Sequence, residues 1–379
     1  MELRGPFFAK NLEHGATLAP PGGRRDVIRF QGPDVEIENT IKNAGFADYS
    51  TMGQIFVVGS DALRMLNYLI VNDLSKCKPG RGIYTMFLNE KGHPLDDTII
   101  YHTEKNCYLV VTSTPGSFPI LKALNEEAAK KDKYDDVHII EASMGLLPVC
   151  GPRVRDILGK LAPIVHDMRY FDIVKTHLVT EEYEIPCYLA RTGYSGELSF
   201  EIYVPGRYGA ITFDVLMEAG KEFGLAPYGA ETEESLRVEK CYHGGVYADD
   251  YLLTASPYQC FLGWTVKLDK GDFVGRDALI KQKEEGLETQ LAGLEILGTD
   301  EVAPIGADVI NKDGITIGKI TCSTYGRRVK KSVAIPYVQT KYAKIGEIYT
   351  IRDPKTGKEL KAEMVDTPFY DKEDKVLKG

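Results

Sequence analysis

The sequence lacks the features that mark several large classes of protein. Its 379 residues contain no apolar run of the roughly 18 residues that a membrane-spanning helix requires. The N-terminal segment MELRGPFFAKNLEHG carries Glu2 and has no apolar core of the kind found in secretory signals. Acidic residues outnumber basic ones, 55 against 46, which leaves no excess of positive charge for nucleic acid phosphates. We expect a cytoplasmic protein whose partners include neither nucleic acid nor a membrane.

Motifs for metal binding and nucleophilic catalysis are missing as well. The seven cysteines and seven histidines are scattered, without CxxC, HxH or HxxxH spacing, which predicts reduced thiols and no protein metal site. The chain has no GxSxG motif, no GxGxxG after a strand and no GxxxxGK[ST] motif. Serine hydrolases and the common nucleotide-binding folds therefore have no support.

The residue pattern changes once along the chain. Up to about residue 285, strand-like and helix-like segments are interleaved, as in QIFVVGSDALRMLNYLI, where Ser60 is the expected N-cap of a helix. From about Gln290 onward, apolar and polar residues alternate, and Asp313-Gly314 and Thr356-Gly357 are hairpin signals. We predict an α+β part over residues 1–285 and a C-terminal all-β barrel or sandwich over residues 286–379.

The segment GHPLDD places two adjacent carboxylates, Asp96 and Asp97, between two strand-like runs. Neighbouring residues of a strand point to opposite faces, so one carboxylate would face inward. An inward aspartate in a dry site can accept a proton or stabilise a developing cation. The alternative interpretation is an ordinary turn with two solvated acids.

The segment RTGYSGELSFE predicts a hairpin turn with more polar side chains than a turn needs. Its carboxylates accept hydrogen bonds from a paired N–H edge, such as that of guanidinium, guanine or a pterin. A hairpin with a solvated glutamate is the alternative. Glu201 weakens that alternative because it lies beyond the turn, between Phe200 and Ile202.

The segment SLRVEKCYHGGVYADD predicts a helix followed by a glycine-rich loop. Arg237 and Glu239 fit an ion pair better than a catalytic role. His243 fits a surface or hydrogen-bonded histidine better than a base.

Six segments in order resemble one family, the folate-dependent aminomethyltransferases typified by the T-protein of the glycine cleavage system. They are IKNAGFADYSTMG, GHPLDDTIIY, RTGYSGELSFEI, SLRVEK, LGWTVKLDKGDFVGRDAL and GKITCSTYGRRVKKSVAIPYV. The resemblance covers about residues 36–365. It implies a three-lobed, cloverleaf α+β fold, with two α+β lobes and a C-terminal β-barrel lobe around a tetrahydrofolate channel.

The resemblance also implies residue roles. Asp96 corresponds to the catalytic carboxylate of the family. Because tetrahydrofolate supplies the nucleophilic nitrogen, the protein needs no nucleophile of its own. The positions that correspond to folate-binding residues are Tyr194, Glu201, Met52, Leu88 and, more loosely, Tyr247.

Three positions depart from the family pattern on the substrate side, and the third has two candidate residues. Thr51 stands where the glycine-cleavage branch usually has histidine, and His93 replaces a glycine before the aspartate pair. A family arginine that anchors the acidic side of folate becomes Glu231 or Glu233, depending on the alignment. In addition, SLRVEKCY is closer to demethylating relatives than to the T-protein.

Three functions are consistent with these residues. The first is a stand-alone methyltransferase that moves a methyl group from a small O-, N- or S-methylated donor to tetrahydrofolate. The second is a glycine-cleavage aminomethyltransferase that works with a lipoyl carrier protein. The third is a non-catalytic folate-binding regulatory protein, and the presence of Asp96 counts against it.

Overall fold

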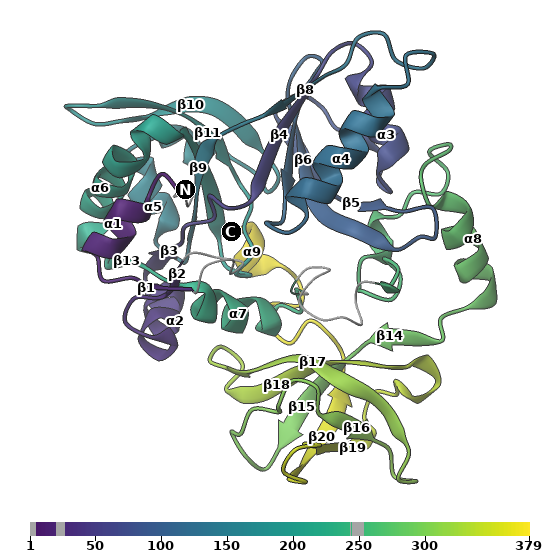
Figure 1. The fold of residues 1–379 in the computed structure, drawn as a ribbon. Helices are drawn as coiled ribbons and strands as arrows, with labels where there is room; N and C mark the ends of the chain where they lie inside the picture. Colours follow the sequence, from purple (N-terminus) through teal and green to yellow (C-terminus); the bar gives the residue numbers. More distant parts are fainter. Residues whose placement is uncertain (1–4, 20–26, 243, 245–253) are drawn as a thin grey trace. The chain divides into compact units, whose positions relative to one another are not determined.

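The computed structural model describes residues 5–19, 27–242, 244 and 254–379, and the chain divides into two compact units (Figure 1). Unit 1 comprises Met1–Phe87, Asp96–Glu233 and Val376–Gly379, and unit 2 comprises Leu88–Leu95 and Glu234–Lys375. Within the described ranges, no helix is long and apolar enough to cross a membrane.

The first sheet of unit 1 has six strands. Their order is β10 (Ile173–Val179), β11 (Glu184–Ala190), β12 (Ser199–Pro205), β9 (Met144–Cys150), β3 (Ala44–Phe46) and β13 (Leu225–Pro227). On β12, Phe200, Ile202 and Val204 pack in one core cluster with residues of α5 (Val154–Gly159) and α6 (Gly209–Gly220). Because side chains alternate along a strand, Glu201 and Tyr203 point to the opposite face of this sheet.

The second sheet of unit 1 has five strands, in the order β5 (Arg81–Leu88), β6 (Pro94–Glu104), β7 (Cys107–Thr112), β4 (Gly53–Val58) and β8 (His138–Glu141). Helix α4 (Ser117–Ala128) contacts β4 and β8, and α3 (Ala62–Leu69) contacts α4. The buried residues of α3 are spaced three and four apart, which gives the helix one apolar face: Ala62, Met65, Leu66 and Leu69.

The N-cap predicted for this helix was wrong. Asp61 occupies the N-cap position of α3, and the hydroxyl of Ser60 instead donates to Asp136 Oδ2 at 2.8 Å. Asp136 comes from a distant segment, so the sequence around Ser60 carries no sign of this contact.

A shared apolar cluster joins the inner faces of the two sheets. Tyr101 and Leu109 contribute from the five-stranded sheet, and Leu146, Ala190 and Tyr203 contribute from the six-stranded sheet. Polar groups on these inner faces are therefore enclosed between two layers of strands, away from bulk water.

The remaining elements of unit 1 are short. Strands β1 (Thr17–Leu18) and β2 (Val27–Arg29) pair with each other, and β13 runs parallel to β3. The other helices are α1 (Phe8–Glu13) and α2 (Pro33–Lys42), with the start of α7 (Ala230–Glu239) and the end of α9 (Lys375–Lys378). Gly224 ends the turn after α6 with a φ of 69°, because glycine adopts this left-handed conformation readily.

Unit 2 contains a closed six-stranded barrel. The hydrogen-bonded circuit runs β18 (Lys331–Gln339), β15 (Gly293–Leu297), β20 (Glu359–Val365), β19 (Ile348–Arg352), β16 (Asp308–Ile310) and β17 (Thr316–Gly326), which pairs back to β18. Strand β14 (Thr289–Leu291) adds to β18, and α8 (Arg276–Glu285) precedes it. Gly314 and Gly357 adopt positive φ in the two predicted hairpin turns. The predicted all-β module is confirmed as a barrel.

The helix predicted from SLRVEK is α7, and its charged residues do pair. Arg237 bonds Glu234, three residues earlier, rather than Glu239. Glu239 pairs with Arg328 at 3.3 Å, and both side chains are buried. His243 lies outside the described residues.

The buried core of unit 1 predicts the effect of a substitution in β12. Phe200→Ala should lower the free energy of unfolding of this unit by about 3–5 kcal/mol, because removal of the fully buried ring creates a cavity. Phe118→Ala is the matched control, since that ring is 76% exposed and its loss should change stability by about 0.5 kcal/mol or less. Urea unfolding followed by circular dichroism measures both, and equal effects would contradict the assigned packing.

Candidate functional site

The loop between β11 and β12 forms the predicted hairpin turn. Strands β11 and β12 pair antiparallel with Ala190 opposite Glu201. Gly196 has a φ of 76°, and the Ser195 hydroxyl accepts the N–H of Glu197 at 3.2 Å. Glu197 is only 4% exposed, so this turn is not a solvated surface loop.

Glu201 is held on the inner face by hydroxyl groups from three segments. Its Oε2 accepts hydrogen bonds from Tyr203 Oη at 2.6 Å, Thr192 Oγ1 at 3.0 Å and Tyr101 Oη at 3.4 Å. Burial raises the pKa of Glu201, and the three hydroxyls oppose that rise. Among the described residues, none hydrogen-bonds the other oxygen, Oε1. That oxygen can accept an N–H from a ligand.

Asp96 is fully buried on β6. Its Oδ2 accepts the backbone N–H of Ser113 at 2.8 Å, and its Oδ1 accepts the Ser113 hydroxyl at 2.6 Å. Burial, followed by the charge of Asp97, raises the pKa of Asp96 well above its usual range. The carboxyl presses against Gly116, the residue before α4, where an added Cβ would lie 2.1 Å from Asp96. Only glycine leaves room for the carboxyl at this contact.

Asp97 points to the opposite side of β6, toward the face that carries Tyr101. Tyr84 Oη donates to Asp97 Oδ2 at 2.5 Å, while Asp97 Oδ1 is buried and has no hydrogen-bond partner among the described residues. Burial, followed by the charge of Asp97, raises the pKa of Tyr84, and Tyr194 also contributes. The half-buried Tyr194 of the hairpin loop is therefore within electrostatic reach of Tyr84, which donates to Asp97.

Thr51 lies beside the segment that holds Asp96. Its hydroxyl is 2.9 Å from that of Thr114, the residue after Ser113. Met52 packs, partly buried, against the apolar cluster between the two sheets. Unit 1 thus brings two of the predicted positions near Asp96 and the inner face.

Glu231 and Glu233, the two residues that can align with the family arginine, have different surroundings in the structure. The side chain of Glu231 is 38% exposed and pairs with Arg29 at 3.1 Å. Glu233 is 1% exposed, and its Oε2 accepts the hydroxyl of Tyr228 at 2.6 Å. The charge of Glu233 raises the pKa of Glu201, although burial is the larger cause. Only Glu233 therefore belongs with the carboxylates of the inner face.

Three predicted positions lie outside the described part of unit 1. Leu88 and His93 belong to unit 2, where the backbone N–H of His93 donates to Asn89 Oδ1 in a tight turn. Tyr247 lies outside the described residues. The functional roles predicted for these three residues stay predictions.

Sequence reasoning missed the residues that hold the carboxylates. Tyr203 and Thr192 could have been found, since Tyr203 shares a strand face with Glu201 and Thr192 lies in the same hairpin. Nothing in the local sequence links the remaining supporting residues to the carboxylates they contact: Tyr84, Tyr101, Ser113 and Tyr228.

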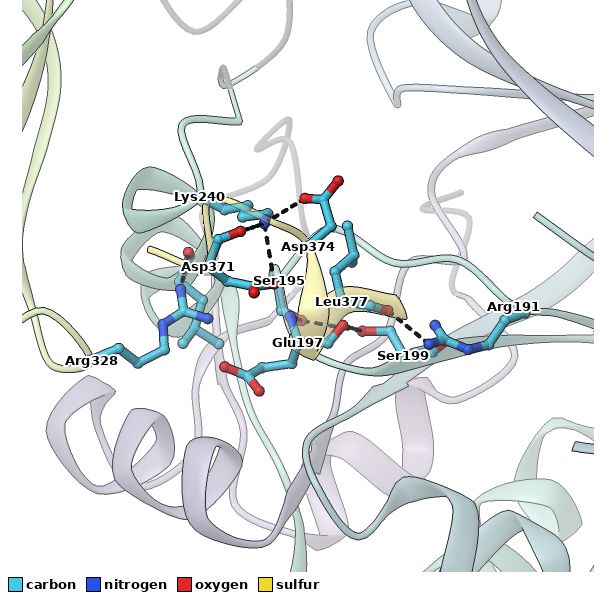
Figure 2. Close-up of polar contacts among 10 residues, drawn as sticks. Arg191, Ser195, Glu197, Ser199, Lys240, Arg328, Asp371, Asp374 and Leu377 are labelled. Carbon is cyan, nitrogen blue, oxygen red and sulfur yellow. Dashed lines mark hydrogen bonds and ion pairs between the residues drawn. The ribbon is translucent and has the colours of Figure 1, made fainter. Parts of the chain in front are cut away.

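The hairpin that carries Glu201 is fastened by a buried arginine (Figure 2). Arg191 has no exposed surface, and its two terminal nitrogens donate to Ser199 O at 2.9 Å and Leu377 O at 2.7 Å. Burial lowers the pKa of Arg191 to about 10. Its guanidinium lies 5.1 Å from the centre of the Phe200 ring. The segment Val376–Gly379 therefore packs on unit 1 at the base of the hairpin.

Comparisons with known proteins agree over nearly the whole chain. Residues 7–270 match the GCVT N-terminal domain, and residues 290–371 match the glycine cleavage T-protein C-terminal barrel domain. The aminomethyltransferase of Caldanaerobacter subterraneus is 34% identical over 368 residues, which cover 97% of this chain and 96% of that protein. The aminomethyltransferase of Desulforamulus reducens is 31% identical over 371 residues, or 98% of each protein.

The fold agrees with a solved structure. The glycine cleavage system aminomethyltransferase T from Bartonella henselae superposes with a TM-score of 0.85, over 97% of this chain and 98% of that chain, at 24% identity. The architecture is thus that of an aminomethyltransferase-type α+β protein with a C-terminal β-barrel. The chain belongs to the glycine cleavage T-protein family, as its resemblance predicted.

The domain boundary predicted at residues 285 and 286 falls between the two family matches. The two compact units divide the chain differently, because residues 88–95 and 234–285 group with the barrel. The boundary stays a prediction.

The burial of Glu201 predicts a pH dependence of stability. Its raised pKa means that the folded protein keeps this carboxyl protonated where the unfolded chain, with a pKa near 4.5, has released the proton. The stabilisation is complete below that pH and is lost as the pH rises through the folded pKa. Glu201→Gln stays neutral, so its stability relative to the original protein should increase from about pH 4 to pH 8. Urea unfolding at several pH values measures this difference, and a constant difference would contradict the assignment.

Proposed function

We propose that this protein is a tetrahydrofolate-dependent one-carbon transferase that moves a methyl group from a small O-, N- or S-methylated donor to tetrahydrofolate. The observation that carries the proposal is the state of Glu201. One oxygen of this buried carboxylate is fixed by three hydroxyls, and the other has no protein donor among the described residues. The names of the relatives, aminomethyltransferases at 31–34% identity, support one-carbon transfer.

The described residues fit tetrahydrofolate. A reduced pterin presents a row of N–H donors, which need an acceptor-only group such as a carboxylate. Glu201 supplies that group on a face lined by apolar and aromatic side chains, including Tyr101, Leu146 and Tyr203. When bound, tetrahydrofolate supplies the nitrogen that accepts the one-carbon unit.

The aspartate pair of β6 suits proton management: Asp97 lies on the face that carries Tyr101, and Asp96 lies on the opposite face. Asp96 holds its proton at a higher pH than an ordinary aspartate, because burial and the charge of Asp97 both disfavour its ionised form. A carboxyl whose pKa is moved toward neutrality can both hold and release a proton, which general acid–base catalysis requires. Ser113 fixes the orientation of Asp96, and Tyr84 fixes that of Asp97.

The donor depends on the positions that depart from the family pattern. Thr51 offers a small hydroxyl, bonded to Thr114, in place of an imidazole. Glu233, one of the two glutamates that can align with the family arginine, places a buried carboxylate in unit 1. These changes alter the charge and size of the site, and they support a small methylated donor.

A second candidate is the aminomethyltransferase of a glycine cleavage system, with a lipoyl carrier protein as the donor partner. The observation that favours it is the printed name shared by the full-length relatives, together with that of the Bartonella henselae structure.

The catalytic role of Asp96 predicts a separation of binding from turnover. Asp96→Asn should bind tetrahydrofolate with unchanged affinity and lose turnover by about 10²–10⁴-fold, because the amide cannot exchange a proton. Calorimetric titration measures binding, and formation of one-carbon-loaded tetrahydrofolate measures turnover. Asp167→Asn is the control, since that side chain is exposed. Turnover of Asp96→Asn at the original rate would show that Asp96 is not catalytic.

The donor assignment predicts activity without a protein partner. The purified chain, given tetrahydrofolate and a panel of O-, N- and S-methylated compounds, should form 5-methyltetrahydrofolate. A strict requirement for an aminomethyl-loaded lipoyl carrier protein would instead establish the second candidate. Tight tetrahydrofolate binding with neither activity would identify a non-catalytic folate-binding protein.

A further inference from the structure

Glu233 is a buried carboxylate with an unused oxygen. It lies on α7 and is 1% exposed, and Tyr228 donates to its Oε2 at 2.6 Å. Its Oε1 is buried and has no hydrogen-bond partner among the described residues. A buried carboxylate oxygen without a donor is unfavourable, so the position suits a ligand that brings one.

The surroundings of Glu233 indicate the chemistry of that ligand. Its charge acts on Glu201 and on Cys150, raising the pKa of each in addition to the larger effect of burial. Among the ion pairs of the described residues, none includes Glu201 or Glu233. Two neighbouring carboxylates without a protein cation favour a ligand with several N–H donors and disfavour an anionic one.

We propose that Glu233 is a second carboxylate that binds the pteridine ring, so that Glu201 and Glu233 together accept its N–H groups. This inference rests on the proposed function, in which the ligand is tetrahydrofolate. A tetrahydropterin carries N–H donors on three ring nitrogens and on its amino group. One carboxylate pairs with two of them, which leaves further donors for the second.

The assignment has a consequence for the rest of the ligand. An acceptor-only, anionic side chain cannot bind the carboxylates of the folate tail. Glu233 therefore contributes to the pterin end of the ligand, and its effect on affinity does not depend on the tail.

Glu233→Gln tests the proposal with two probes, tetrahydrofolate and 6-methyltetrahydropterin, which has no tail. The substitution removes the charge and keeps the size of the side chain. We expect it to weaken both ligands to the same extent, by about tenfold, as measured by calorimetric titration under anaerobic conditions. Glu231→Gln is the matched control on the same helix, and its affinity should not change, because the side chain of Glu231 is 38% exposed and pairs with Arg29.

Tyr228→Phe is the second variant, in case Glu233→Gln does not fold. It removes the hydroxyl that orients Glu233 and should weaken 6-methyltetrahydropterin by about twofold to fivefold. Unchanged pterin affinity in folded Glu233→Gln, or in folded Tyr228→Phe if Glu233→Gln does not fold, overturns the role of Glu233. If Glu201→Gln still weakens binding, the proposed function stands and only this inference fails. If the original protein binds neither probe, the proposed function fails and this inference fails with it.

Discussion

The hydrogen bonds that three hydroxyls donate to Glu201 are the interaction on which the candidate site depends. A carboxylate buried between two sheets is unfavourable unless donors compensate for the lost water. Tyr203, Thr192 and Tyr101 provide them from β12, from the hairpin loop and from β6. These bonds fix one oxygen and leave the other available, which makes this buried group a candidate for ligand binding. They also require both sheets to be in place.

Strand alternation distributes apolar and functional side chains between the two faces of each sheet. On β12, Phe200 and Ile202 pack in the core with α5 and α6, while Glu201 faces the second sheet. On β6, Asp96 meets Ser113 and Gly116, and Asp97 meets Tyr84 on the other side. Alternate residues of one strand can therefore pack in the core and line the candidate site.

Family membership identifies the fold and the class of protein, whereas the residues of the candidate site bear on the donor. The matches over residues 7–270 and 290–371 establish the fold and the class of protein. The proposed donor instead rests on positions where this chain departs from the family pattern, above all Thr51 and one of the two glutamates Glu231 and Glu233. Thr51 is half-buried and hydrogen-bonded to Thr114, whereas Glu233 is buried and accepts the hydroxyl of Tyr228.

The sequence by itself determined the features whose signals are local or cover the whole chain. Alternating residues with Gly314 and Gly357 predicted the barrel, the glycines around Tyr194 predicted the hairpin, and six ordered segments predicted the family. Only the tertiary structure decided that Glu233, and not Glu231, joins Glu201, that Asp136 binds Ser60, and that Ser113 and Tyr84 hold the aspartates. Turns and strand patterns depend on neighbouring residues, whereas these contacts join segments that are distant in the chain.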